Sequence, residues 1–360
     1  MNTVATPGRP ARPRRRPAAR RSGRAGRPAA RPGKRPSSRP QDRPSIRAAG
    51  LPADGRSGTV LAVVAASTGL LLVAHGALPD VGGLGSLVET FLPWSCLVLL
   101  VLGVLAARRR ATGAGLSVLF ATGIWLWVCW PFSSATPAPR PNLVVVHHNV
   151  ADTNAEPGAT AAVLLEPEPD VVTLVEVTPQ LDEAFTGAFA EDLPYRAVEG
   201  TVGVWSRFPL VGGEPVDIRP PDVDASWERG LRVVVDTPDG SDVRVYAVHA
   251  PSVRLGLQGF GSGPRDASLR MLAEVLAEDS SSAIVVGGDL NTTLADRALD
   301  PVLDQVATPA GWGFTFPAAL PVVRIDHVLA RGAEITRVAT LGRTGSDHRP
   351  VVAEVALPSD

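Results

Sequence analysis

The chain has 360 residues with 35 basic and 36 acidic side chains, so its formal net charge is only −1. This average covers unlike parts: residues 1–57 carry 16 basic and 2 acidic side chains, whereas residues 140–360 have a net charge of −16. The overall charge therefore says nothing about partners, and each part must be considered separately. Two cysteines in 360 residues exclude a disulfide-rich scaffold.

Residues 1–57 consist mainly of Arg, Pro, Ala, Gly and Ser, with almost no large apolar side chains. Such a composition cannot bury enough apolar surface to offset the entropy lost on ordering, which predicts a disordered tail. Two interpretations stay open. The tail is a solvated cytoplasmic segment that fixes membrane orientation, or it contacts nucleic acid or anionic lipid.

Three apolar stretches follow the tail, and each is long enough, or nearly so, to cross a hydrocarbon core of about 30 Å. They predict a membrane domain over residues 58–133 with three transmembrane helices, at about 59–78, 91–107 and 114–132. The triplet Arg108–Arg110 lies between the second and third stretches, whereas residues 79–90 carry only acidic charge. The positive-inside rule then predicts a multi-pass protein of the cell membrane with a cytoplasmic N-terminus and an extracytoplasmic C-terminal part.

Residues 134–141 read as a linker, and residues 142–357 as a separate domain of short apolar runs divided by turn residues. Both cysteines precede this domain, so it depends on a hydrophobic core without disulfides. The pattern predicts an α/β protein with two face-to-face sheets and helices outside. The expected strands are 143–147, 171–175, 202–205, 231–236, 243–249, 284–286, 323–329, 334–340 and 351–355, and the expected helices 159–165, 179–190 and 264–278.

The run Ile284–Asn291 is the most informative stretch of this domain. A strand rich in β-branched residues ends at two glycines and then presents Asp289 and Asn291. Taken alone, it fits a structural Asx turn as well as it fits a functional site.

Other predicted strands also end in polar residues that can bind metal or transfer protons. They run into His148-Asn149, Glu176, His249, Asp289 with Asn291, Asp326-His327 and Asp347-His348. Carboxylates beside apolar strands are costly unless they have partners or a function. Oxygen ligands without cysteine favour Mg²⁺ or Mn²⁺, and histidines add proton-transfer groups, which together suit hydrolysis of a phosphate ester. The sequence has no G-x-S-x-G elbow and no P-loop.

This ordered series resembles the endonuclease/exonuclease/phosphatase superfamily, which includes DNase I-like nucleases, exonuclease III-like enzymes, inositol polyphosphate 5-phosphatases and neutral sphingomyelinases. The resemblance covers roughly residues 142–357. Its motifs are His-Asn-Val at 148–150, Asp-Val-Val-x-Leu-x-Glu at 170–176, Gly-x-x-x-Ser-Arg-x-Pro at 203–209, His-Ala-Pro at 249–251, Gly-Asp-Leu-Asn at 288–291, Ile-Asp-His at 325–327 and Ser-Asp-His-Arg-Pro-Val at 346–351. Val175 and Leu290 depart from the common Gln and Phe without removing a catalytic group.

The resemblance implies a four-layer α/β/β/α sandwich and a role for each motif residue. Glu176 would be the principal metal carboxylate, with Asn149 and Asp347 completing the metal and water shell. Asp289 would position or deprotonate the attacking water. Asn291 would orient the phosphoryl group. His348 would contact the phosphate and would be held and kept charged by Asp326. His249 would be a second histidine on the phosphate side. His147 and His327 are expected to be structural, and Arg207 and Asn154 fit either role.

The resemblance leaves the substrate open. Because a domain with a net charge of −16 lacks the positive field that long nucleic acids need, the favoured function is a membrane-anchored, metal-dependent phosphodiesterase or phosphatase acting on a small or lipid-linked phosphoester. The alternatives are an extracellular nuclease and a catalytically inactive, membrane-anchored binding protein. The oligomeric state is open as well.

Overall fold

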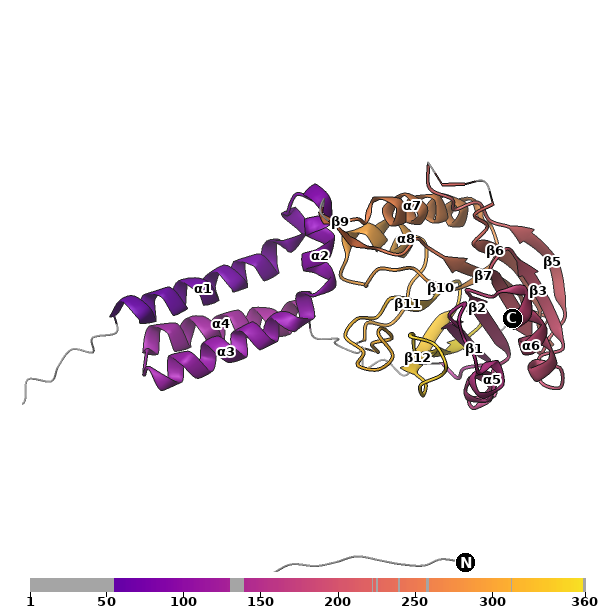
Figure 1. Ribbon diagram of the computed structural model, residues 1–360, viewed down its shortest axis with the longest axis horizontal. Helices are drawn as coiled ribbons and strands as arrows, with labels where there is room; N and C mark the ends of the chain where they lie inside the picture. The colour runs from indigo at the N-terminus through magenta and orange to yellow at the C-terminus, as the bar shows by residue number, and fades with distance from the viewer. Residues whose placement is uncertain are drawn as a thin grey trace, which may run out of the picture. The chain divides into compact units, whose positions relative to one another are not determined.

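The computed structural model describes residues 55–129 and 139–358, apart from residues 222, 225, 239, 257, 258 and 312. Almost all of the expected basic tail lies outside the described residues. So do the end of the third apolar stretch and most of the expected linker. The ribbon in Figure 1 shows a set of long helices near the N-terminus and two sheets in the C-terminal part.

Three helices, α1 (Gly55–Ala74), α3 (Ser95–Arg108) and α4 (Thr112–Cys129), pack along one another (Figure 1). By length and composition α1 and α4 can each cross a membrane, whereas α3 has only 14 residues. A helical segment over 81–90 precedes α3 across a bend of 62°. Among the described residues, two helices rather than the expected three are thus candidate membrane spans, and a third candidate exists only if the bent pair counts as one span. Pro93, which has no N–H to donate, lies at the bend and explains why the helix does not run on.

Small apolar clusters hold these helices together, and larger apolar side chains point outward. Leu61, Ala65 and Val118 belong to one cluster and Leu72 and Leu99 to another. A helix that is apolar on all sides is typical of a membrane span or of a buried position. The exposed apolar side chains include Val60, Leu70, Leu100, Leu116, Phe120 and Trp127.

The first sheet has six strands in the order β12-β13-β1-β2-β4-β3. Within it β1 and β2 are parallel, and the other neighbours are antiparallel. Its strands are β1 (Leu143–Asn149), β2 (Val171–Val175), β3 (Tyr195–Glu199), β4 (Val202–Ser206), β12 (Glu334–Thr340) and β13 (Val351–Ala356).

The second sheet has five strands in the order β11-β10-β7-β6-β5, and β7 and β10 are its parallel pair. Its strands are β5 (Leu210–Pro215), β6 (Gly230–Asp236), β7 (Asp242–His249), β10 (Ala283–Asp289) and β11 (Asp326–Arg331). A separate hairpin of β8 (Leu255–Gly256) and β9 (Gly259–Phe260) follows β7.

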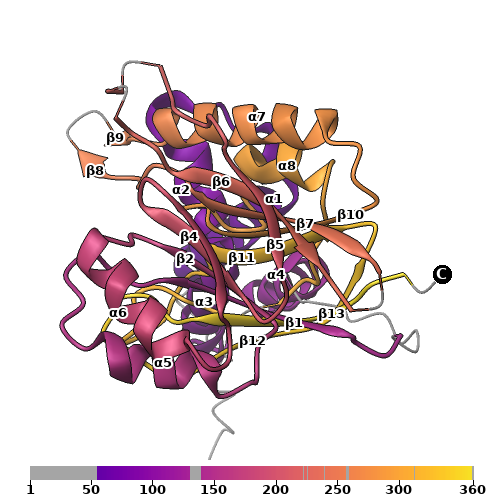
Figure 2. The same ribbon diagram turned by 90° about the vertical axis from the view of Figure 1, so that its right-hand side faces the viewer.

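The two sheets pack face to face with helices on both outer surfaces, as Figure 2 shows. One apolar cluster, which includes Val145, Val245 and Val285, lies between the sheets. A second covers the outer face of the first sheet with α5 (Pro157–Leu165) and α6 (Pro179–Phe189). A third covers the outer face of the second sheet with α7 (Gly263–Glu278) and α8 (Asp300–Leu303). The expected four layers are all present.

Helix α6 illustrates how local sequence sets this packing. Thr178 caps the helix by accepting a hydrogen bond from the N–H of Leu181, and a proline occupies the first turn. Leu181, Phe185 and Phe189 recur at four-residue spacing and are buried. Both phenylalanine rings meet the ring of Trp205 edge-on, so the helix is fixed against the first sheet.

The expected strands and helices are present with small shifts of their ends, and three differences are larger. The strand expected at 323–329 begins only at Asp326, because Val323 pairs instead with Phe316 in an isolated bridge. The prediction missed β3 and β5, whose residues are largely exposed and lack an apolar run. It also missed the two-residue strands of the hairpin, which carry no periodicity.

The connection over residues 75–94 contacts loops of the C-terminal domain. Arg297, in the loop after β10, donates to both carboxylate oxygens of the fully buried Glu89. Trp94 donates its indole N–H to the carbonyl of Val322, in the loop before β11. The hairpin after β7 contacts Val81–Gly83. All three loops leave the edge of the second sheet at which β7 and β10 end and β11 begins.

Candidate active site

Strand register brings the polar strand ends together. Asp289 at the end of β10 pairs with His249 on β7 and with Asp326 on β11. In the first sheet, Asn149 pairs with Val175, the residue before Glu176. Because parallel neighbours end at the same edge, four strands deliver their polar residues to one region between the sheets.

The side-chain amide of Asn149 lies between two carboxylates. Its Nδ2 is 3.1 Å from Oε1 of Glu176 and 3.0 Å from Oδ2 of Asp289, while its Oδ1 accepts from the N–H of Ala151. The amide supplies a partial positive charge between two groups that would otherwise repel each other. Asn149 and Asp289 are buried, whereas the Glu176 side chain is 32% exposed, so the group opens to solvent on the Glu176 side.

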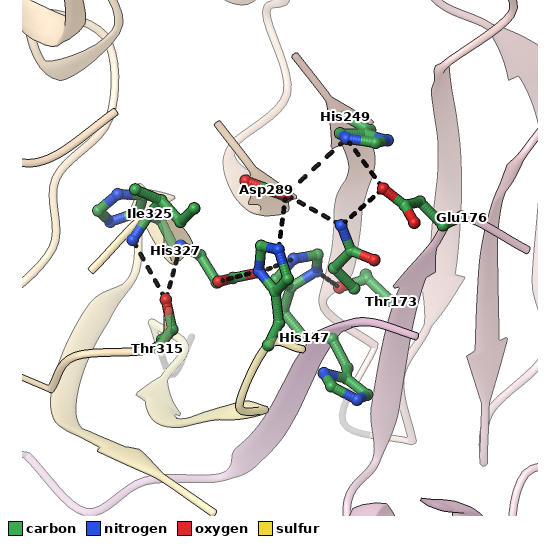
Figure 3. A network of polar contacts seen from close by, with 12 residues as sticks. His147, Thr173, Glu176, His249, Asp289, Thr315, Ile325 and His327 are labelled. Atoms are coloured by element: carbon green, nitrogen blue, oxygen red, sulfur yellow. Dashed lines mark hydrogen bonds and ion pairs between the residues drawn. The ribbon is translucent and has the colours of Figure 1, made fainter. Parts of the chain in front are cut away.

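His249, on the second sheet, lies against the same two carboxylates. Figure 3 shows its ring and Glu176 turned toward Asp289. Its Nε2 lies 3.7 Å from Oε1 of Glu176 and 3.8 Å from Oδ2 of Asp289. Its Nδ1 is 3.2 Å from the guanidinium of Arg229. Burial and the charge of Arg229 hold the pKa of His249 well below its usual range. The ring is therefore neutral at physiological pH.

His348 has the opposite electrostatic surroundings. Its Nδ1 lies 2.8 Å from Oδ2 of Asp326, and its Nε2 lies 3.8 Å from Oδ2 of Asp289. Burial opposes the charge, but the carboxylates of Asp326 and Asp289 outweigh it and raise the pKa of His348 to about 10. The hydroxyl of Thr315 accepts from the backbone N–H of Ile325 and Asp326 and so fixes the partner carboxylate.

Asp289 is the carboxylate that all these groups face. Burial and the charge of Asp326 raise its pKa to about 7, although His348, Asn149 and the N–H of Asn291 favour the ionised form. Such a pKa suits a group that exchanges a proton near neutral pH.

Two residues of the candidate site have an unusual backbone conformation. Glu176 has φ of 63° and Asn291 has φ of 50°, both in the left-handed region that non-glycine residues seldom adopt. Asn291 is held there by three bonds: its N–H donates to Asp289, its Nδ2 to the carbonyl of Ala250, and its own carbonyl accepts from Arg265. Backbone strain that costs about 1–3 kcal/mol per residue is typical of functional sites.

The structure thus brings together seven of the eight residues that the sequence pointed to. These are Asn149, Glu176, His249, Asp289, Asn291, Asp326 and His348. The eighth, Asp347, is exposed, and in the described part of the chain no side-chain bond joins it to Asn149 or Glu176. The charge of its carboxylate helps to raise the pKa of His348. Its place in a metal shell stays a prediction.

The sequence prediction missed Arg229, which lies beside His249, Glu176 and Asp289. Arg229 precedes β6 rather than following a strand, so the search for polar strand ends passed over it. Thr315 was missed as well, because it acts through backbone groups 10 residues along the chain. Neither residue carries a sequence signal beyond its type.

The remaining histidines have partners away from the two carboxylates that Asn149 bridges. His147 Nδ1 lies 3.0 Å from Oγ1 of Thr173, and its Nε2 faces Asp326 at 3.7 Å. His327 Nε2 donates to the carbonyl of Thr292 at 2.8 Å, and burial lowers the pKa of His327 to about 3. His148 lies 2.9 Å from the hydroxyl of Thr344.

Arg207 and Asn154, which fitted either role, have structural partners. Arg207 forms an ion pair with Asp170 at 3.1 Å. Asn154 donates to the carbonyl of Val150 and to Thr160. In the described structure, neither residue contacts the carboxylates of Glu176 and Asp289.

The donor set can hold a hard divalent cation. Glu176 and Asp289 both direct a carboxylate oxygen at the amide of Asn149, which offers an oxygen ligand after rotation about its last bond. Ligand atoms of Asp289, Asp326 and His348 also lie within 4.8 Å of one another. In that second set, however, His348 and His147 already engage Asp326. The first set therefore fits a metal better.

Residues 146–348 match the Endonuclease/Exonuclease/phosphatase family. Among similar solved structures, an endonuclease/exonuclease/phosphatase from Beutenbergia cavernae is 23% identical, with 61% of this chain and 72% of that chain covered and a TM-score of 0.47. Sphingomyelinase C from Streptomyces griseocarneus is 21% identical, with 61% and 100% covered and a TM-score of 0.46. A beta toxin from Staphylococcus aureus is 16% identical, with 59% and 99% covered and a TM-score of 0.49. No match was found among curated proteins.

Proposed function

This chain belongs to the Endonuclease/Exonuclease/phosphatase family, and we propose that it is a membrane-anchored, divalent-metal-dependent hydrolase of phosphoester bonds. One observation carries the proposal: Glu176 and Asp289, two carboxylates from different sheets, meet at the amide of Asn149, with a neutral and a charged histidine beside them. A structural cluster has no need of a histidine pair held in opposite protonation states, whereas acid–base chemistry does.

Glu176 and Asn149 would hold the metal, which supports the assignment of Mg²⁺ or Mn²⁺. When bound, such an ion offsets charge on the phosphoryl group and makes a water ligand more acidic. Asp347 remains a candidate for the outer part of this shell, because it is exposed on the residue next to His348.

Asp289 would orient the attacking water and take its proton, since its pKa of about 7 lets it act as a base near neutral pH. His348, kept protonated by Asp326, would donate Nε2–H to a phosphoryl oxygen and stabilise the negative charge that develops there. Asn291 would donate to the same group of oxygens after its amide turns from Ala250. His249 would lie on the phosphate side, with its neutral ring oriented by Arg229.

The N-terminal helices support the membrane anchor. α1 and α4 are long and apolar enough to cross a bilayer, and they carry exposed large apolar side chains. We take the bent pair that ends with α3 as the middle span. Arg108–Arg110 between α3 and α4 would then lie in the cytoplasm on the same side as the basic tail, and the catalytic domain would lie outside the cell membrane.

The substrate we propose is a small or lipid-linked phosphoester rather than a long nucleic acid. The net charge of −16 over residues 140–360 disfavours a long polyanion. Loops that leave the candidate site's edge of the second sheet also contact residues 75–94, which connect the membrane helices. A site at that edge is suited to a substrate held near the bilayer.

The test uses the full chain purified in a neutral detergent and measures Mg²⁺-dependent hydrolysis of a generic phosphodiester, of phospholipids in mixed micelles and of DNA. His348→Ala should lose at least about 10²-fold in kcat, whereas Arg337→Gln, a change of an exposed arginine on β12, should leave the rate unchanged. No Mg²⁺-dependent turnover on any substrate would refute the enzyme and favour an inactive binding protein. DNA cleavage that exceeds the other activities and falls steeply with salt would replace the proposed substrate with nucleic acid.

The proposed orientation has its own test. A reporter enzyme that is active only outside the cytoplasm, fused after residue 360, should be active. A reporter fused between Arg110 and Ala111 should be inactive. The opposite pattern would overturn the orientation without affecting the proposed chemistry.

A further inference from the structure

A pocket of about 430 Å³ lies where the membrane helices meet the C-terminal domain. Its apolar walls include Leu92 and Pro93 from the 3-10 turn just before α3, Val128 at the end of α4, and Phe314 and Val323 from the loop before β11. The volume is within the range of about 300–1,000 Å³ that is usual for small-molecule sites. None of the residues assigned to the candidate active site lines it.

Arg324 lines this pocket and is only 4% exposed. Its Nη1 is 3.4 Å from the carbonyl of Pro309 and its Nη2 is 3.3 Å from the hydroxyl of Thr308, both long for hydrogen bonds. Its Nε has no partner, and within the described ranges no carboxylate lies at ion-pair distance from the guanidinium. Asp326, two residues away, is already engaged by His348 and His147.

The other charged groups of the pocket are accounted for. Glu89 is bound by Arg297 and by His75. Arg297 directs its remaining donors to the carbonyls of His75, Gly76 and Leu78. Asp300 is exposed, so water screens its charge. A buried charge without a counterion is costly, and Arg324 is the one charged group here whose cost the described contacts leave uncompensated.

We propose that this pocket binds an amphiphile with an anionic headgroup, whose oxygens pair with Arg324 and whose chain lies against the apolar walls. A guanidinium binds phosphate or carboxylate oxygens strongly when it is shielded from water. Leu92 lies just before α3 and Val128 lies at the end of α4, at the level where lipid headgroups would lie if the proposed membrane anchor holds. The site is separate from the candidate active site, so binding does not require turnover.

The test measures thermal unfolding of the full chain in dodecyl maltoside, a neutral detergent, with increasing dodecyl phosphate as the probe. We expect a saturable rise in Tm with dodecyl phosphate. Inorganic phosphate at the same concentration should give none, because it lacks the chain. Arg324→Gln should weaken the response at least tenfold while its own Tm without probe is no lower than that of the parent protein. A response that survives in Arg324→Gln, or an equal response to inorganic phosphate, would overturn the proposal.

Two matched variants separate this site from the others. Glu176→Gln should keep the full response to dodecyl phosphate while it loses hydrolysis, so failure of the proposed enzyme function would leave this result standing. Arg337→Gln removes an exposed arginine and should also keep the response. If Arg324→Gln does not fold, Val128→Trp, which fills the pocket from α4, should abolish the response instead, and its persistence there would refute the site.

Discussion

Nδ1 of His348 lies 2.8 Å from Oδ2 of Asp326, and Asp326 is fully buried. The two residues come from the loop before β13 and from the first residue of β11. The ion pair raises the pKa of the His348 imidazole to about 10, so under the proposed function the site presents a cation to an incoming phosphoryl group at neutral pH. The stabilisation by this pair is fully present below the unfolded pKa of about 6.5 and is lost as pH rises through about 10.

Asp326→Asn should therefore lower the pKa of His348, because the change removes the carboxylate that contributes most to raising it. We expect kcat at pH 8 to fall by about 10²–10³-fold and the alkaline limb of the pH–rate profile to move to lower pH. The measurement is kcat between pH 5 and 10 with Mg²⁺ in excess. Asp242→Asn, at the opposite end of β7, is the control and should change neither quantity. An unchanged alkaline limb in Asp326→Asn would show that His348 does not act as a cation.

Asp289→Asn should stabilise the metal-free protein while it abolishes hydrolysis. The folded-state pKa of Asp289, about 7, is above the usual value of about 3.8, so the stability that its proton brings is lost as pH rises through 7. At pH 8 the variant should be more stable than the parent by about 1–3 kcal/mol, and at pH 5 the difference should shrink. Urea unfolding in EDTA at both pH values measures this. Equal stability of the two proteins at pH 8 would contradict the assigned pKa shift.

Glu176→Gln and Asp347→Asn should differ in their effect on metal affinity. Glu176 lies against Asn149 and Asp289, whereas Asp347 is exposed and contacts neither. We expect Glu176→Gln to weaken Mn²⁺ binding at least about 100-fold, and Asp347→Asn to weaken it by less than about tenfold. Titration of Mn²⁺ followed by electron paramagnetic resonance measures both without the need for turnover. A larger loss in Asp347→Asn would move the principal ligand from Glu176 to Asp347.

Glu89 and Arg297 should couple the N-terminal helices to the C-terminal domain. Glu89 is fully buried and accepts from the backbone N–H and the side chain of Arg297. Glu89→Gln or Arg297→Gln should each cost about 2 kcal/mol, less than a fully buried pair because Arg297 is 32% exposed, and the double variant should cost much less than the sum. Arg337→Gln, which breaks an exposed pair with Glu354, should cost under about 1 kcal/mol. Additive losses in the double variant would show that the pair does not link the two parts.

Most strands of the two sheets, and most of the residues that meet at the candidate site, were predicted from the sequence for one physical reason. Buried strands need apolar side chains, so a carboxylate that ends such a strand, as Asp289 does, stands out in the pattern. Edge strands such as β3 carry no such contrast, because their exposed residues tolerate polar side chains. The middle apolar stretch is helical over Leu92–Arg108, close to the expected 91–107, but it is a candidate span only together with the segment 81–90, from which it is bent by 62°. The prediction counted apolar residues and could not foresee this bend.

Contacts between distant parts of the chain could not be predicted in this way. Arg229 acquires its place beside His249 from the register of β6 on β7, and nothing near it in the sequence marks a site. Likewise Arg265 links the carbonyl of Asn291 to the hydroxyl of Ser86, 179 residues away. Such pairings depend on tertiary packing, which a single sequence does not display.

Gly287→Ala should destabilise the sandwich, because Gly287 of β10 lies directly against Thr173 of β2 in the other sheet. An added Cβ on this residue would meet the Thr173 hydroxyl at a distance too short for a real side chain, and it would also crowd the β-carbon and the methyl group of Thr173. The sheets would have to separate at this point, at a cost of about 1–3 kcal/mol. Since Thr173 also holds His147, which faces Asp326, we expect activity to fall as well.

Gly187→Ala is the matched control for Gly287→Ala. Gly187 is an exposed position within α6 with open space around it, and alanine there should stabilise the helix by about 0.5–1 kcal/mol. Urea unfolding of both variants measures the contrast. If Gly287→Ala is as stable as the parent protein, the sheets are packed less tightly here than the contact with Thr173 requires.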